Sequence, residues 1–348
     1  MKTLFLIYGG KSQEHDISIL TAFNILKAIS YDTYTVKPIY IQKNGDWILG
    51  QTLTQPVENE AVLTWEKVGQ SVLPTVVKEE NAVVFPVLHG PNGEDGTVQG
   101  LFEILDTAYV GTGVLASACG MDKIISKKLF AQAGLPQLPY VTILKKQWLS
   151  SAETVVTLCE KELTYPMFVK PANLGSSVGI SKATNKDELI KAIELALSFD
   201  RRVVVEKGVI ARELEVAVLG YDDIKASVVG EVVKVVDFYD FEEKYKNNQA
   251  TLQIPAQIPE DISETLRQYA IQAFEAIDGS GLTRCDFFLT EDNKIYINEV
   301  NTLPGFTQFS MYPLLWEATG IPYADLVNML LDLAVKRYEE KRVYQMVE

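Results

Sequence analysis

The sequence predicts an α/β protein of two or three domains, and three observations support this prediction. The chain has 348 residues, of which 47% are apolar, enough for more than one hydrophobic core. Its N-terminal part alternates strand-like apolar runs with amphipathic stretches, a pattern typical of a parallel sheet covered by helices. Near the C-terminus two strand-like runs flank a cluster of turn residues, which indicates an antiparallel hairpin. An α/β part is therefore expected to precede an α+β part.

The composition excludes several classes of function. A formal net charge of −14 argues against nucleic acid or an anionic membrane as a partner. An anionic nucleotide stays compatible with this charge only where nearby cations or a metal ion offset it. The apolar run before Gly9 is too short for a signal peptide, and no run reaches membrane-spanning length, so we expect a cytoplasmic protein. Two histidines, and three cysteines without C-x-x-C spacing, argue against histidine-ligated metals and structural disulfides.

The N-terminal elements follow one another as strand, turn and helix. Strands are expected at 3–8, 35–42 and 81–88, with an amphipathic helix at about 14–29. The third strand runs into a glycine-rich loop that starts at His89 and leads to a helix ending near Leu105. Free backbone N–H groups at such loops bind anionic ligands. Glycines that only form turns, with His89 as a hydrogen-bonded core histidine, are an equally good interpretation of this stretch alone.

The middle of the chain begins after a domain boundary expected near Gly120. Asp122 is a good N-cap for a helix at 123–133. An apolar strand at 165–171 then carries Lys170 and is followed by a loop rich in glycine and serine. Consecutive N–H groups of such a loop can surround phosphate oxygens, and a lysine adds positive charge. A flexible hairpin loop is the alternative.

Carboxylates mark the next strands. Glu206 lies near the end of a strand at 201–209, where a carboxylate beside peptide groups can bind an adenine edge and a ribose. Glu213 and Glu215 share a face of the following strand, and these residues alone favour a solvated sheet edge. The irregular segment 235–254 is typical of a functional loop or lid, with Lys244 and Tyr245 as its candidate working residues.

The C-terminal hairpin carries the residues with the most chemistry. Alternation places Arg284 and Asp286 on one face of the strand at 282–289, and Glu299 and Asn301 on one face of the strand at 294–300. If the two faces coincide, the carboxylates repel one another unless positive charge lies between them. Hard oxygen donors without His or Cys select Mg²⁺ or Mn²⁺. A solvated face with an ordinary Arg/Asp pair is the alternative.

Four blocks in this order make the chain resemble the D-alanine:D-alanine ligase family of the ATP-grasp superfamily, essentially from end to end. The blocks are Ser12-Gln13-Glu14 with Ile17-Ser18, His89 to Gly100, Lys170-Pro171 with Gly175 to Gly179, and Arg284-Cys285-Asp286 with Glu299 to Gly305. The resemblance implies three domains, expected here at 1–120, 121–215 and 216–348. The first is an N-terminal α/β domain, and the other two clamp ATP between antiparallel sheets.

The resemblance also implies a reaction. ATP phosphorylates the carboxylate of one D-alanine, the amine of a second D-alanine attacks the acyl phosphate, and the tetrahedral intermediate collapses to D-alanyl-D-alanine, ADP and phosphate. This dipeptide serves peptidoglycan precursor synthesis. The implied ligands of two Mg²⁺ or Mn²⁺ ions are Asp286, Glu299 and Asn301. The implied nucleotide-binding residues are Lys123, Lys170, Ser177, Glu206, Lys207, Val209, Glu213 and Lys244.

Roles toward the two D-alanine molecules follow from the same resemblance. Glu14 would bind the ammonium of the first D-alanine, and Arg284 with the N–H of Gly305 would form the oxyanion site. Ser176 and Tyr245 would bond to one another and to Glu14, closing the lid against water. The remaining substrate positions are His89, Ser310 and Met311.

Alternatives remain within and outside this family. A tyrosine at Tyr245 resembles the branch that forms the dipeptide, whereas a D-alanine:D-lactate or D-alanine:D-serine ligase would use another second substrate. A nucleotide-binding module without turnover is a third possibility, although a pure binder has no use for an oxyanion donor such as Arg284. The resemblance also implies a homodimer.

Overall fold

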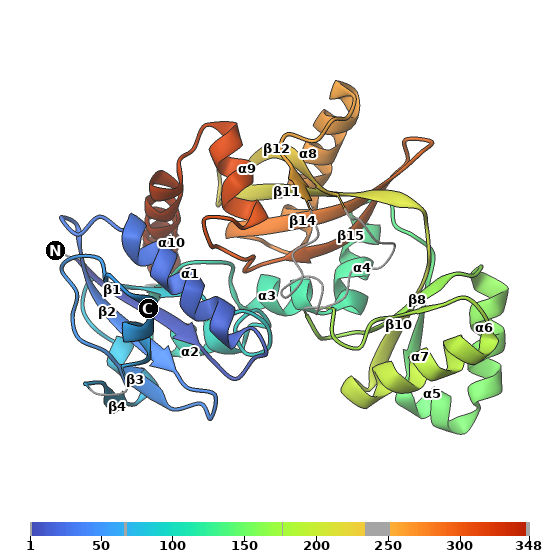
Figure 1. The fold of residues 1–348 in the computed structure, drawn as a ribbon, viewed down its shortest axis with the longest axis horizontal. Helices are drawn as coiled ribbons and strands as arrows, with labels where there is room; N and C mark the ends of the chain where they lie inside the picture. The colour runs from blue at the N-terminus through green and yellow to red at the C-terminus, as the bar shows by residue number, and fades with distance from the viewer. Residues whose placement is uncertain (1, 66–67, 176, 234–250, 346–348) are drawn as a thin grey trace.

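The computed structural model describes residues 2–65, 68–175, 177–233 and 251–345. Ser176, Lys244 and Tyr245 lie outside this part, so their predicted roles stay predictions. Within it the strands form three sheets, of six, four and five strands, and each sheet draws on a different part of the chain (Figure 1). The mixture of a parallel α/β sheet with antiparallel sheets confirms the predicted fold class.

The N-terminal sheet has a parallel centre and an antiparallel edge. Its parallel strands are, in spatial order, β2 (Tyr34–Ile41), β1 (Lys2–Gly9), β5 (Ala82–Pro86) and β6 (Ala108–Tyr109). The antiparallel edge strands are β3 (Trp47–Leu49) and β4 (Gln70–Val72). β1 is buried from Leu4 to Tyr8, because both faces of the parallel sheet are covered, and this explains its continuous apolar run. The covering helices include α1 (His15–Ala28) and α2 (Thr97–Ile104).

The central sheet is antiparallel. Its strands are, in spatial order, β7 (Tyr140–Leu144), β10 (Arg202–Lys207), β8 (Met167–Pro171) and β9 (Ser181–Ala183). The helices that flank it are α5 (Lys145–Ser150), α6 (Ala152–Glu162) and α7 (Lys186–Phe199). A further helix, α4 (Lys123–Gln132), lies between this sheet and the C-terminal one (Figure 1), where Ile124 packs with Ala172 and Val204. Asp122 caps α4 as predicted.

The C-terminal sheet is also antiparallel. Its strands are, in spatial order, β13 (Thr251–Gln253), β12 (Lys225–Val233), β11 (Ala211–Gly220), β14 (Gly281–Thr290) and β15 (Ile295–Asn301). The helices packed around it include α3 (Val114–Met121), α8 (Glu260–Ala276) and α9 (Met311–Thr319). β14 and β15 form the predicted hairpin. The expected boundary at 215/216 falls inside β11, which pairs with β14 along its whole length; we therefore propose that the domain change lies just before Ala211.

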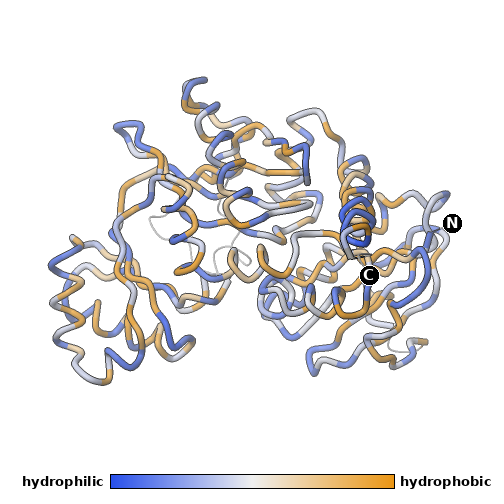
Figure 2. Tube along the Cα trace, turned by 180° about the vertical axis from the view of Figure 1, so that it is seen from behind, coloured by the Kyte–Doolittle hydropathy of each residue, from blue (hydrophilic) through white to orange (hydrophobic). Residues whose placement is uncertain are grey.

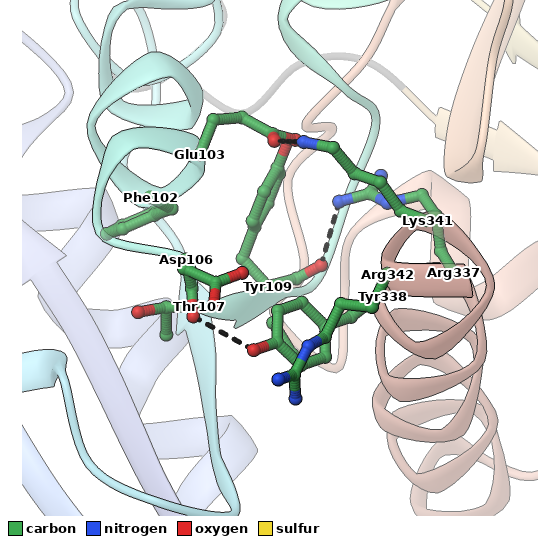
Figure 3. A pocket seen from close by; sticks show the side chains of 10 residues that line it. Phe102, Glu103, Asp106, Thr107, Tyr109, Arg337, Tyr338, Lys341 and Arg342 are labelled. Atoms are coloured by element: carbon green, nitrogen blue, oxygen red, sulfur yellow. Dashed lines mark hydrogen bonds and ion pairs between the residues drawn. The ribbon is translucent and has the colours of Figure 1, made fainter. Parts of the chain in front are cut away.

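The last helix, α10 (Tyr323–Gln345), returns to the N-terminal sheet and lies beside α1 (Figure 1). Arg337 joins the two regions, because its guanidinium donates to the carbonyl of Tyr109 (Figure 3). It also donates to the carbonyl of Gly111 and to the Ser280 hydroxyl. The joint is close-packed: its cavity holds about 20 Å³, room for about one water molecule. The first half of α10 has one buried apolar face, formed by Leu326, Val327, Leu330, Leu331 and Ala334. Its last turns, beside the C-terminus, are mostly hydrophilic (Figure 2).

Candidate active site

Three strands of the C-terminal sheet line up a row of carboxylates. Asp286 on β14 is the register partner of Glu215 on β11 and of Glu299 on β15. One step along the same face, Arg284 is the register partner of Asn301. The polar faces of the two hairpin strands therefore coincide, as the alternation argument required.

A β-bulge on β15 makes this coincidence possible. Phe287 pairs with Ile297 and Asp286 pairs with Glu299, so Asn298 is an extra residue without a partner of its own. Ile297 is buried in the core, whereas Glu299 is half-buried on the carboxylate face. Regular alternation would have put both on one side. The bulge instead turns the strand, so that Asn298 accepts a hydrogen bond from Lys170 Nζ at 3.2 Å.

Arg284 is held between two carboxylates. Its Nε and Nη2 donate to Oδ1 and Oδ2 of Asp286, both at 2.7 Å, and its Nε lies 2.9 Å from Glu215 Oε2. Burial alone would lower the pKa of Arg284, but Asp286, Glu215 and then Glu299 outweigh it and raise the pKa well above its usual value. The guanidinium therefore stays charged, and the cluster keeps an excess of negative charge.

Two lysines from other elements reach the same face. Lys123, the first residue of α4, donates to Leu174 O at 2.8 Å, and its Nζ lies 3.8 Å from Glu299 Oε2. Lys170, on β8, contacts the bulge residue Asn298. The glycine-serine loop, the central sheet and the hairpin thus meet in one network of polar contacts.

Glu206 forms an ion pair with Lys170. Its Oε2 lies 2.5 Å from Lys170 Nζ, and its Oε1 forms an ion pair with Lys127 of α4. Burial alone would raise the pKa of Glu206, but the ammonium groups of Lys127 and Lys170 outweigh it and lower the pKa to about 2. The pKa of Lys170 is raised, since Glu206 and Glu299 more than offset its burial. A carboxylate oxygen has two lone pairs, so Glu206 can still accept a further hydrogen bond.

The residues predicted for the nucleotide base lie at the end of β10. Lys207 is exposed, and the N–H groups of Lys207 and Gly208 donate to Pro139 O at 3.0 Å and to Pro166 O at 2.7 Å. Two further residues predicted to bind the nucleotide, Val209 and Glu213, are half-buried. Ser177, in the glycine-serine loop, is also half-buried. Ser177 has a positive φ of 57°, a backbone conformation typical of a tight turn.

The predicted site for the first amino acid lies where α1 meets the loop after β5. An ideal Cβ on Gly90 would lie 3.1 Å from Glu14 Oε2, so the carboxylate sits directly over this glycine. His89 is buried: its Nε2 lies 3.2 Å from Thr21 Oγ1 and its Nδ1 lies 3.2 Å from Leu303 O. Burial lowers the pKa of His89 although Glu14 raises it, so the neutral ring donates to Leu303 and accepts from Thr21. This is the hydrogen-bonded core histidine of the alternative interpretation.

The loop after β15 carries the remaining predicted residues. An ideal Cβ on Gly305 would lie 3.1 Å from Ser310 Oγ, and the Ser310 hydroxyl accepts from the Thr307 N–H at 3.1 Å. Met311 begins α9, and its side chain is buried in the core. Only its backbone N–H, at the helix N-terminus, is therefore suited to bind a substrate carboxylate.

Family models match two parts of this chain. The model described as D-ala D-ala ligase N-terminus matches residues 3–112, and the one described as D-ala D-ala ligase C-terminus matches residues 129–332. The chain belongs to the D-alanine–D-alanine ligase family. The predicted resemblance is thereby confirmed.

Relatives of this ligase-family chain are similar along nearly its whole length. It is 52% identical to a D-alanine–D-alanine ligase of Enterococcus hirae, covering 97% of each chain, and 53% identical to one of Bacillus licheniformis, covering 98% of each. Two solved structures are also similar. The VanG D-Ala:D-Ser ligase of Enterococcus faecalis has a TM-score of 0.86 at 34% identity over 96% of this chain and 99% of that one. The D-alanine-D-alanine ligase of Coxiella burnetii has a TM-score of 0.85 at 32% identity over 99% and 98%.

The sequence did not identify three residues of this site. Lys127 lies four residues after Lys123, a spacing that puts both on one face of a helix, and this was the one available signal. Alternation places Glu215 on one face with Glu213 and predicted a solvated sheet edge. In the structure the Glu215 side chain is only 14% exposed and forms an ion pair with Arg284. Asn298 could not be found, because its position depends on the bulge.

The predicted metal ligands suit a hard divalent cation. Asp286 and Glu299 face each other, and Asn301 adds an amide oxygen whose other contact is the Leu303 N–H at 3.0 Å. Oxygen donors of this kind are those that Mg²⁺ and Mn²⁺ prefer. In the described part of the chain, no three His, Cys, Asp or Glu side chains form a metal site, so a metal here would depend on the amide and on ligand oxygens.

None of the helices described is long and apolar enough to cross a membrane.

Proposed function

We propose that this chain joins two D-alanine molecules to D-alanyl-D-alanine at the expense of ATP, for peptidoglycan precursor synthesis. One observation carries the proposal. Lys123 from α4 and Lys170 from the central sheet contact Glu299 and Asn298, next to the pair of Arg284 and Asp286. Cations for a polyphosphate, carboxylates for a divalent metal and a donor for a developing oxyanion thus share one site.

The residues divide the chemistry among them. Phosphoryl transfer needs charge neutralisation and positioning more than covalent help. Lys123 and Lys170 supply positive charge from two sides. Asp286, Glu299 and Asn301 would hold Mg²⁺ or Mn²⁺, which would supply positive charge to neutralise the phosphates. Arg284 donates hydrogen bonds to the oxyanion that forms when the amine attacks the activated carboxyl group.

The N-terminal domain would bind the first D-alanine. Glu14 offers a carboxylate to its ammonium group, and Gly90 leaves room for that carboxylate. His89 acts indirectly, because its ring joins this loop to Leu303, two residues before Gly305. The Gly305 N–H would complete the oxyanion site, and Ser310 with the α9 N-terminus would bind the second D-alanine. Ser176, Lys244 and Tyr245 would close over the reacting groups.

The second substrate is the point on which related ligases differ. Several D-alanine–D-alanine ligases are 50 to 53% identical to this chain, and they favour D-alanine as the second substrate. The two solved structures do not separate the activities, because the D-Ala:D-Ser ligase is 34% identical and the Coxiella burnetii D-alanine-D-alanine ligase 32%. We also propose a homodimer in the cytoplasm, as the family resemblance implies; sedimentation should then give twice the 38.8 kDa of one chain.

A product assay tests the proposed function. The purified chain is incubated with ATP, Mg²⁺ and D-alanine, alone or mixed with D-serine or D-lactate, and products are identified by mass spectrometry. D-Alanyl-D-alanine should dominate in every mixture, and a metal chelator should abolish it. Failure to form the dipeptide from D-alanine, together with a product from D-lactate or D-serine, would assign another ligase activity. ATP binding without any product would indicate a binding module.

A further inference from the structure

A buried cluster of three charges lies between α4 and the central sheet. It consists of Lys127 on α4, Glu206 on β10 and Lys170 on β8. The three side chains are 3%, 4% and 11% exposed, so water and salt cannot neutralise them effectively. Two ammonium groups and one carboxylate give the cluster a formal charge of +1.

The strand register explains why these groups meet. Glu206 pairs with Phe168 on β8, and Lys170 is two residues further along the same strand, so both side chains lie on one face of the sheet. α4 packs on this face through Ile124. Lys127 therefore reaches Glu206 from the side opposite Lys170.

Lys127 has no polar partner besides Glu206 in the part of the chain that the structure describes. Its ammonium makes no hydrogen bond outside this ion pair, and it lies 5.2 Å from the centre of the Tyr140 ring. Its buried ammonium contacts Oε1 of Glu206, whereas Lys170 contacts Oε2. Any effect of Lys127 on the site must therefore pass through Glu206.

The formal charges show how Lys127 affects the positive charge at Lys170. Glu206 and Lys170 alone would form a neutral pair, and the positive charge of Lys170 would be cancelled inside the protein. With Lys127 on the other oxygen, Glu206 is shared between two ammonium groups. The excess positive charge stays at Lys170, which also contacts Asn298 at the edge of the metal-binding face.

We propose that Lys127 is a positioning residue for nucleotide binding, which neutralises Glu206 from behind so that the Lys170 ammonium can bind a phosphate group of ATP. This inference deepens the proposed function and rests on it. Lys127 also fixes the Glu206 carboxylate next to Lys170.

The test compares variants in the full-length chain. Lys127→Met removes the charge, Lys127→Arg keeps it, and Lys128→Met changes an exposed neighbour on the same helix as a control. Calorimetry without metal ions measures the dissociation constants of ADP and of inorganic tripolyphosphate, which contains no base. A unit charge roughly 7 to 8 Å from a phosphate, at an effective dielectric constant of about 20, changes affinity by about 30- to 55-fold. Lys127→Met should weaken both ligands by about this factor, and Lys127→Arg and Lys128→Met should stay within about threefold of wild type.

A second variant separates charge from structure. Lys127→Met with Glu206→Gln leaves Lys170 as the cluster's one charge, and the formal charge returns to +1. Tripolyphosphate affinity should therefore recover at least about tenfold relative to Lys127→Met. A purely structural role for Lys127 predicts no recovery, because the double variant loses more native contacts. Should Lys127→Met not fold, the double variant is compared with wild type, and tripolyphosphate binding more than about tenfold weaker would overturn the proposal.

Other outcomes are equally clear. Lys127→Met binding ADP and tripolyphosphate as tightly as wild type would overturn the inference and leave the proposed function intact. A wild-type chain that binds ADP but forms no dipeptide would overturn the proposed function, while the binding series would still decide the role of Lys127.

Discussion

Gly93 offers a sharp test of how the N-terminal loop supports the active site. An ideal Cβ at this position would lie 1.7 Å from Leu88 O and 2.5 Å from Leu88 C, both backbone atoms. A Cβ essentially never approaches closer than 3.0 Å, so Gly93→Ala requires the two backbone segments to separate by at least about 1.3 Å. The loop cannot yield freely, since Gly93 O also accepts a hydrogen bond from Gln99 at 2.7 Å.

This displacement reaches the predicted site of the first D-alanine. Gly93 N–H donates to Gly90 O, and Gly90 lies under the Glu14 carboxylate. A shift of about 1 Å in a positioning element can cost about 100-fold in rate. Gly93→Ala should therefore lower kcat/KM for D-alanine by about this factor and lower the free energy of unfolding by about 2 to 4 kcal/mol.

Gly100 provides the matched control. It lies within α2, and an ideal Cβ there has no atom within 4 Å. Gly100→Ala should raise the free energy of unfolding by up to about 1 kcal/mol, because alanine favours a helix over glycine, and should leave kcat/KM unchanged. Steady-state kinetics and urea unfolding measure both quantities. Wild-type kinetics in Gly93→Ala, or an equal loss in Gly100→Ala, would refute this reasoning.

Three further predictions follow from the site. Arg284→Lys keeps the charge but loses the fork of hydrogen bonds, so kcat should fall roughly 100- to 1000-fold while calorimetric ADP affinity changes little; an unchanged kcat would exclude Arg284 from the oxyanion site. Asp122→Ala removes the N-cap of α4 and the ion-pair partner of Arg202, so the free energy of unfolding in urea should fall by about 1 to 3 kcal/mol. The KM for ATP should also rise, because Lys123 is displaced. Asp122→Asn keeps the cap, so its free energy of unfolding should fall by less. The pKa of Glu206 is lowered from 4.5 to about 2 in the folded state, so its ionised form stabilises the fold fully above pH 4.5 and progressively less toward pH 2. Between pH 6 and 3.5 the free energy of unfolding of the wild type should therefore fall by about 1.4 kcal/mol more than that of Glu206→Gln. Parallel pH profiles of the two proteins in urea unfolding would contradict this.

Local patterns predicted much of the fold because each depends on neighbouring residues. The hairpin of β14 and β15 followed from alternation and a turn cluster, and its residues from Leu282 to Val300 lie close to the observed bounds. The cap at Asp122 followed from residue type and a following helical pattern. These features need no information about distant parts of the chain.

What the sequence left open depends on tertiary contacts. The bulge at Asn298 places Glu299 on the carboxylate face, although strict alternation from Ile297 would direct it to the core. β11 pairs along its whole length with β14, a strand about 70 residues later, so charge patterns near 215 did not reveal the domain change. Lys127 appeared to be one of several lysines on a helix until β8 and β10 brought Glu206 against it.

The central claim is that ATP activates the carboxylate of the first D-alanine at the face shared by Arg284, Asp286 and Glu299. Isotope transfer tests it directly. With D-alanine labelled by ¹⁸O in its carboxyl group, an acyl phosphate leaves one labelled oxygen in the released phosphate for each dipeptide formed. Mass spectrometry of the phosphate should show that label in step with D-alanyl-D-alanine. Dipeptide formation with unlabelled phosphate would contradict the account.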